Sequence, residues 1–160
     1  MKIKHIWSVL CKESVINQDD NTISLHGILE KLSSTLKPIN NPKTTDLKKQ
    51  KKIVFPISYE IVSFWTKELS KEINLNISIK LIDPKGNILE KIINEAKFPK
   101  ESKRLRTRLK VQGLPVSENG MYLFKVSVKS EKEKKYTIVS EIPLEVQYKI
   151  IPDNKNTPPN

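Results

Sequence analysis

The sequence predicts one all-β domain, a single antiparallel β-sandwich of about eight strands with an immunoglobulin-, fibronectin- or C2-like arrangement. Apolar and polar residues alternate in most segments, as in strands with one buried face. Turn residues separate these segments at short intervals, and no segment of useful length has the repeat of an amphipathic helix. A chain of 160 residues is long enough to bury one core, and we expect that domain to span residues 1–150.

The first half of the domain contains three predicted strands. Two of them, Ile3–Leu10 and Ile23–Leu29, flank a polar turn at residues 17–21. The third begins at Ile53, alternates between apolar and polar positions, and runs on towards Trp65.

The second half contains the clearest alternation in the chain, Glu72–Leu81, where every odd-numbered residue is aliphatic and every even-numbered residue is polar. Turn residues follow at 83–87, where a proline presets φ and a glycine supplies a positive φ. The same alternation predicts the remaining strands: 88–93, 104–111, 122–128 and 142–148. The tail 151–160 is rich in proline and is predicted to be disordered.

Three segments carry a resemblance to known proteins: Ile6–Cys11, Asn21–Glu30 and the strand that opens with Gly120-Met121-Tyr122. An opening strand leads through a polar turn into a strand of the type Ser-Leu-x-Gly-Ile. In these features the chain resembles a bacterial family of uncharacterised small β-sandwich domains over residues 4–150. The resemblance implies the fold only, because that family has no established activity.

Net charge and cysteine content bear on the partner and the compartment. The formal net charge of +11 attracts phosphates, acidic proteins and anionic surfaces at low salt. The single cysteine, Cys11, cannot form an intramolecular disulfide and is most simply a small buried side chain, which favours the reducing cytosol. The apolar stretch near the N-terminus is short, and no stretch approaches the ~18 apolar residues of a membrane span. We therefore expect a cytoplasmic protein without a membrane partner.

The sequence lacks the residue patterns of the common catalytic and metal sites. His5 and His26 are predicted on neighbouring strands, and each is most simply a strand histidine rather than a metal ligand. Asp19, Asp20 and Asp83 sit in turns, where single aspartates usually bond their own backbone. We therefore predict no catalytic residue, no metal, no cofactor and no enzymatic activity.

All three arginines of the chain fall in one predicted strand, at Arg104, Arg106 and Arg108, and Lys110 continues the series. On a strand these cations share one face and repeat every ~6.6–7 Å. Arginine, whose planar guanidinium matches a carboxylate or a phosphate, therefore occurs only in this strand. The simplest interpretation is a solvated face on which each arginine either lies over a neighbour's apolar surface or pairs with a glutamate nearby in sequence: Glu90, Glu95, Glu101 and Glu118.

Two functional hypotheses remain for this basic strand. The leading one is a non-enzymatic interaction module that binds an acidic protein partner, aided by an exposed aromatic side chain such as Trp65. The alternative is weak electrostatic binding of RNA or single-stranded DNA. Such binding would be non-specific, because no aromatic residue alternates with the arginines to stack bases. Serine at all three arginine positions is expected to leave the fold intact. An exposed edge strand could also pair with its twin, so the sequence leaves the oligomeric state open.

A lysine cluster lies in the polar segment 40–52, which we expect to be a loop. Its members are Lys48, Lys49, Lys51 and Lys52. They would add positive charge to a surface that binds a polyanion.

Overall fold

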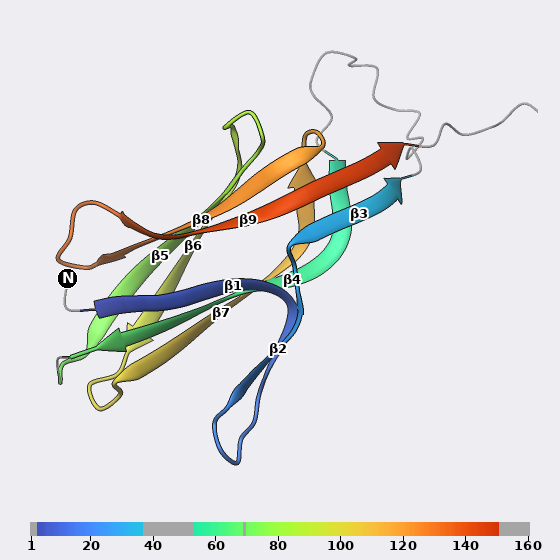
Figure 1. Cartoon of the computed structure of the whole chain (residues 1–160). Helices are drawn as coiled ribbons and strands as arrows, with labels where there is room; N and C mark the ends of the chain where they lie inside the picture. The colour runs from blue at the N-terminus through green and yellow to red at the C-terminus, as the bar shows by residue number, and fades with distance from the viewer. Residues whose placement is uncertain (1–2, 37–52, 69, 151–160) are drawn as a thin grey trace, which may run out of the picture.

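The computed structural model describes residues 3–36, 53–68 and 70–150, and these residues form nine β-strands and no helix (Figure 1). The strands are β1 (Ile3–Ile16), β2 (Ile23–Ile28), β3 (Lys31–Leu36), β4 (Ile53–Lys67), β5 (Ile73–Ile82), β6 (Ile88–Phe98), β7 (Arg104–Val116), β8 (Gly120–Ser130) and β9 (Thr137–Ile150). Over this part of the chain, no helix has the length and apolarity needed to cross a membrane.

The strands form two sheets packed as a sandwich, as the sequence predicts. One sheet has the order β2-β1-β4-β7, and the other has the order β3-β9-β8-β5-β6. Figure 1 shows long, curled strands in two layers. The all-β fold class and the sandwich are therefore confirmed.

Strand β3 departs from the expectation in two ways. It is the strand that the sequence pattern missed, because Leu32 and Leu36 are its only large apolar residues. It also pairs in parallel with β9, with Lys31 opposite Glu145, whereas the other strand pairs in the described chain are antiparallel. β3 lies at a sheet edge, and its Leu32 packs against the core.

Strand β1 changes partner along its length, and its second part forms a hairpin with β2. Residues Ile3–Cys11 pair with β4, and Cys11–Ile16 pair with β2. The hairpin bends away from the rest of its sheet (Figure 1). The chain then crosses towards β3, held by a hydrogen bond of 2.9 Å from the Leu29 N–H to the Leu10 carbonyl.

The hydrophobic core fills the space between the two sheets. The alternation predicted for β5 is correct: Ile73 is partly buried against the core, and the four aliphatic residues that follow it at every second position are buried, namely Leu75, Ile77, Ile79 and Leu81. Aromatic rings dominate the largest fully buried side chains: Trp65, Tyr59, Tyr122, Phe98 and Phe124. Two further residues, Cys11 and Val62, are fully buried outside this core cluster, on the outer face of the β2-β1-β4-β7 sheet.

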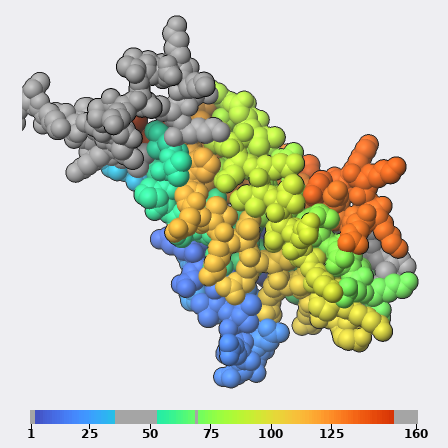
Figure 2. Space-filling model, turned by 180° about the vertical axis from the view of Figure 1, so that it is seen from behind, coloured from blue at the N-terminus to red at the C-terminus, as the bar shows by residue number. Residues whose placement is uncertain are grey.

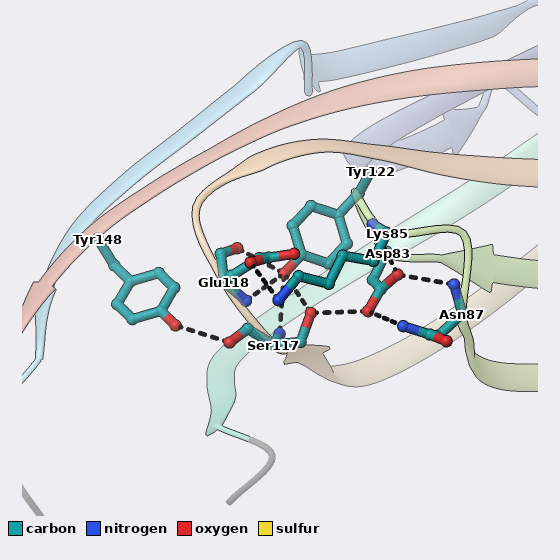
Figure 3. A network of polar contacts seen from close by, with 7 residues as sticks. All are labelled: Asp83, Lys85, Asn87, Ser117, Glu118, Tyr122 and Tyr148. Atoms are coloured by element: carbon teal, nitrogen blue, oxygen red, sulfur yellow. Dashed lines mark hydrogen bonds and ion pairs between the residues drawn. The ribbon is translucent and has the colours of Figure 1, made fainter. Parts of the chain in front are cut away.

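A buried tyrosine organises the turn between β7 and β8 (Figure 3). The hydroxyl of Tyr122 accepts the N–H groups of Ser117 at 2.8 Å and Glu118 at 3.0 Å, and donates to the Glu118 carbonyl at 2.6 Å. This one oxygen therefore satisfies three backbone groups of a tight turn. Gly120 lies against Pro84 with φ at 146°, where an added Cβ would come within 2.8 Å of the proline ring.

The neighbouring β5–β6 turn is built on Asp83. Its carboxylate accepts the N–H groups of Lys85 at 3.0 Å and Asn87 at 2.7 Å, and the Ser117 hydroxyl at 3.0 Å. Burial favours the neutral form of Asp83, but these hydrogen bonds outweigh it and hold the pKa of the carboxyl below its ordinary value. The predicted turn is thus present, with Gly86 at a φ of 87°, and it is tied to the turn of Tyr122.

Candidate interaction surface on a basic strand

The predicted basic series lies on the outer face of β7. Arg104, Arg106, Arg108 and Lys110 stand opposite four residues of β4: Thr66, Phe64, Val62 and Glu60. The residues between them, Leu105 and Leu109 included, face inward and pack against the core. The structure therefore brings the four cations together in one row.

Glu60 is the internal counter-charge of this row. Its side chain is only 4% exposed, and its carboxylate lies 3.3 Å from the Lys110 Nζ and 3.6 Å from the Arg108 Nε. The hydroxyl of Ser14 donates to the same carboxylate. Burial opposes ionisation of Glu60, but the Ser14 hydrogen bond and the two cations outweigh it, so the pKa of Glu60 lies below its ordinary value.

The glutamates predicted as partners do not pair with the arginines. Glu118 pairs with Lys85 at 3.0 Å, and Glu90 faces inward beside Tyr59. The expected pairing is wrong because cross-strand register, rather than closeness in sequence, decides which side chains meet. The other expected arrangement is not contradicted, since Arg106 and Arg108 stand opposite the apolar residues Phe64 and Val62. Glu60 lies directly opposite Lys110 although the two are far apart along the chain.

Two of the arginines hold the β1–β2 hairpin. Arg106 donates to the Asn21 carbonyl at 2.7 Å and to its side-chain oxygen at 3.1 Å. Arg108 donates to the Ser14 carbonyl at 3.2 Å. Asn21 has a φ of 57°, a conformation that asparagine tolerates better than most residues. Replacing all three arginines by serine therefore removes these contacts between the hairpin and β7, so that variant alters the hairpin as well as the charge of the row.

The remaining charge of the row is available to solvent. Arg104 is exposed and makes no ion pair or side-chain hydrogen bond with the described residues. The Lys110 side chain is 69% exposed despite its contact with Glu60. The Arg108 Nε is buried without a hydrogen bond among the described residues. Of the four cations, only Arg108 and Lys110 contact a carboxylate among the described residues, that of Glu60.

Two aromatic side chains lie in line with Arg106 on the neighbouring strands of the sheet. Phe64 lies opposite Arg106, and Trp7 lies opposite Phe64, with the two ring centroids 5.7 Å apart. Both rings are half-buried on the outer face. Trp65, predicted as an exposed aromatic residue, is instead 0% exposed, and its indole N–H donates to the Thr107 hydroxyl at 3.0 Å. Continuing the alternation from Ile61 would have placed Trp65 inward and Phe64 outward.

A shallow groove of about 610 Å³ borders the same surface at Glu60. Its walls mix apolar and polar surface and carry both signs of charge: Lys12, Glu13, Ser58, Tyr59, Glu60, Lys110, Val111 and Gln112. The groove therefore adds a mixed apolar and charged surface at the Lys110 end of the row.

The other residues singled out in the sequence do not form a site. The lysines 48, 49, 51 and 52 and the tail 151–160 lie outside the described residues. His5 contacts Trp65 and Ser8, whereas His26 lies opposite Glu13 near the other end of β1. Across the described part of the chain, no group of histidine, cysteine and carboxylate side chains is arranged to hold a metal ion.

Comparison with known proteins supports the fold but does not indicate a function. No family model matches the chain, and no curated protein matches its sequence. The C-terminal domain of Wzt has a similar structure, with a TM-score of 0.52 and 10% identity over 99% of this chain and 84% of that one. A family 123 glycoside hydrolase from Clostridium perfringens gives 0.47 at 9% identity, covering 92% of this chain and 28% of its own. A family 2 β-glucuronidase gives 0.39 at 15% identity, covering 63% of this chain and 12% of its own.

Proposed function

We propose that this protein is a non-catalytic interaction module that binds an acidic protein partner along the outer face of β7. The observation that carries the proposal is the row of four cations with a single internal carboxylate, Glu60. Positive charge left unneutralised on a rigid strand favours a partner that supplies carboxylates in matching positions.

The neighbouring side chains support a protein partner. Phe64 and Trp7 lie beside Arg106, and aromatic residues and arginine are the residues most enriched in the centres of protein interfaces. The two rings pack on each other and stay half-buried, so they do not form a series of open faces on which successive bases could stack.

The proposal is tested with a variant that spares the hairpin. Arg104→Ser with Lys110→Ser removes the two most exposed cations of the row. The matched control is Lys91→Ser with Lys97→Ser on β6, which removes the same charge, and Lys97 is also ion-paired, to Glu72. Partners are captured on each immobilised protein and quantified.

The β7 variant is expected to recover at least about tenfold less of a specific acidic protein, equivalent to ~1.4 kcal/mol, while the control recovers it normally. Equal recovery by both variants would rule out β7 as the contact surface. Retention of RNA or single-stranded DNA at ~50 mM salt, with no protein recovered, would replace the protein partner by a polyanion.

A further inference from the structure

β7 is an edge strand with a long open side. Among the described residues it pairs only with β4, and it ends the β2-β1-β4-β7 sheet. Figure 2 shows β7, in gold, at the surface between the blue β1–β2 hairpin and the yellow-green β6. The pairing with β4 shifts register between Phe55 and Ser58, opposite Gly113, where φ is 79°. The regular open side therefore runs over Arg104–Gln112.

The phase of the backbone hydrogen bonds shows which residues face that open side. The Lys67 N–H donates to the Lys103 carbonyl at 3.1 Å, which makes these two residues a hydrogen-bonded pair of the antiparallel ladder. Hydrogen-bonded pairs recur at every second residue, so Leu105 and Leu109 bond to β4 through their backbones. The alternate residues therefore direct both their N–H and their C=O groups to the open edge: Arg104, Arg106, Arg108 and Lys110.

We propose that this edge binds an extended peptide with an acidic residue at every second position, which adds to the sheet as an antiparallel strand. The proposal rests on the proposed function and specifies how the partner is recognised. Each cationic residue would use its backbone to form a hydrogen-bonded pair and its side chain to meet the acidic side chain directly opposite. The intervening peptide residues point to the same side as Leu105 and Leu109, so they are expected to be apolar.

The same geometry disfavours a second copy of this chain as the occupant. In every hydrogen-bonded antiparallel register of β7 with its twin, residues that face the open edge oppose one another. Arg104, Arg106, Arg108 and Lys110 would then stand against their own counterparts, and like charges directly opposite one another are destabilising. The arginines therefore protect the edge from self-pairing while leaving it open to an acidic strand.

The test uses the full chain and a labelled peptide in which glutamate alternates with valine, long enough to lie along Arg104–Lys110. Two matched peptides carry N-methyl groups, one on the glutamates and one on the valines. In the proposed register the glutamate N–H groups face β7 and the valine N–H groups face away. Fluorescence anisotropy should show binding of the parent and the valine-methylated peptide, and a loss of about tenfold or more on glutamate methylation.

The outcomes separate the binding mode from the proposed function. Equal affinity of the two methylated peptides would overturn strand addition while leaving docking of acidic proteins on β7 intact, since docking needs no peptide N–H. The opposite preference would overturn the antiparallel register. Absence of binding by the parent peptide would also overturn strand addition, and the capture experiment with Arg104→Ser and Lys110→Ser would then decide the proposed function independently.

Discussion

The turn network around Tyr122 and the basic row of β7 are both polar, but they direct their hydrogen-bonding capacity in opposite directions. Tyr122 and Asp83 find all of their partners described above within adjoining turns of the same chain. In the basic row, only Glu60 is fully enclosed, whereas Arg104 and most of Lys110 face solvent.

The difference separates a structural role from a binding role. A saturated network has nothing left to offer a ligand, and its value lies in fixing turns. A row with surplus charge contributes little to folding at its exposed end, and its free donors are available to a partner. Each prediction below therefore alters one of the two regions and asks whether stability or binding responds.

The largest stability effect is expected for Tyr122→Phe. Loss of the hydroxyl leaves the N–H groups of Ser117 and Glu118 without their acceptor, at a cost of about 2 kcal/mol in the free energy of unfolding. Urea denaturation measures it. Tyr136→Phe is the control, because that ring is half-exposed and should change stability by less than about 0.5 kcal/mol. Equal effects would show that the Tyr122 hydroxyl does not support the turn.

Glu60→Gln is expected to cost about 1–2 kcal/mol, because it leaves the partly buried guanidinium of Arg108 without a counter-charge. The cost stays below that of a fully buried pair because the Arg108 side chain is 29% exposed. Lys110→Gln removes the exposed partner of the same carboxylate and should cost less than about 0.5 kcal/mol. A larger loss for Lys110→Gln than for Glu60→Gln, measured in urea, contradicts the assignment of Glu60 as the buried counter-charge.

The pH dependence of the same pair gives a smaller and more specific effect. The pKa of Glu60 is lowered in the folded protein, so its contribution to stability is present above the unfolded pKa of about 4.3 and is lost as pH falls through the folded pKa. The stability gap between the natural protein and Glu60→Gln should therefore narrow as the pH is lowered from 6 to about 3. A gap that stays constant over this range would show that ionisation of Glu60 contributes nothing.

The fold could be predicted from the sequence wherever a strand has one wet and one buried face. The alternation of β5 names its core residues correctly, and Pro84 and Gly86 mark its turn. β3 was missed because an edge strand needs little apolar surface, and its parallel pairing leaves no local signal. Local periodicity therefore predicts strands better than it predicts how they pair.

The candidate site was predictable only in part, for the same reason. The spacing of Arg104, Arg106 and Arg108 was enough to place them on one face. Their partners could not be predicted from the sequence, because strand register brings Glu60 to β7 and bending of the hairpin brings Asn21 there. Neither property is encoded in neighbouring residues.

The smallest stability effect distinguishes two arginines of the same row. Arg106→Ser removes two hydrogen bonds to Asn21 and is expected to cost about 0.5–1 kcal/mol. Arg104→Ser removes no ion pair or side-chain hydrogen bond with the described residues and should stay within about 0.5 kcal/mol of the natural protein. Hydrogen exchange should sharpen the difference: the Asn17 amide, which donates to Thr22 across the hairpin, should exchange faster in Arg106→Ser only.

The affinity for the acidic peptide should rank the same two variants in the opposite order, with the larger loss in Arg104→Ser. Arg104 has no competing ion pair or side-chain hydrogen bond among the described residues, whereas the Arg106 guanidinium is already bonded to the hairpin. If Arg104→Ser weakens the acidic peptide without changing exchange at Asn17, the free end of the row binds while its middle also supports the fold. If Arg104→Ser instead destabilises the hairpin as much as Arg106→Ser does, the row has one structural role throughout and the contrast with the Tyr122 network disappears.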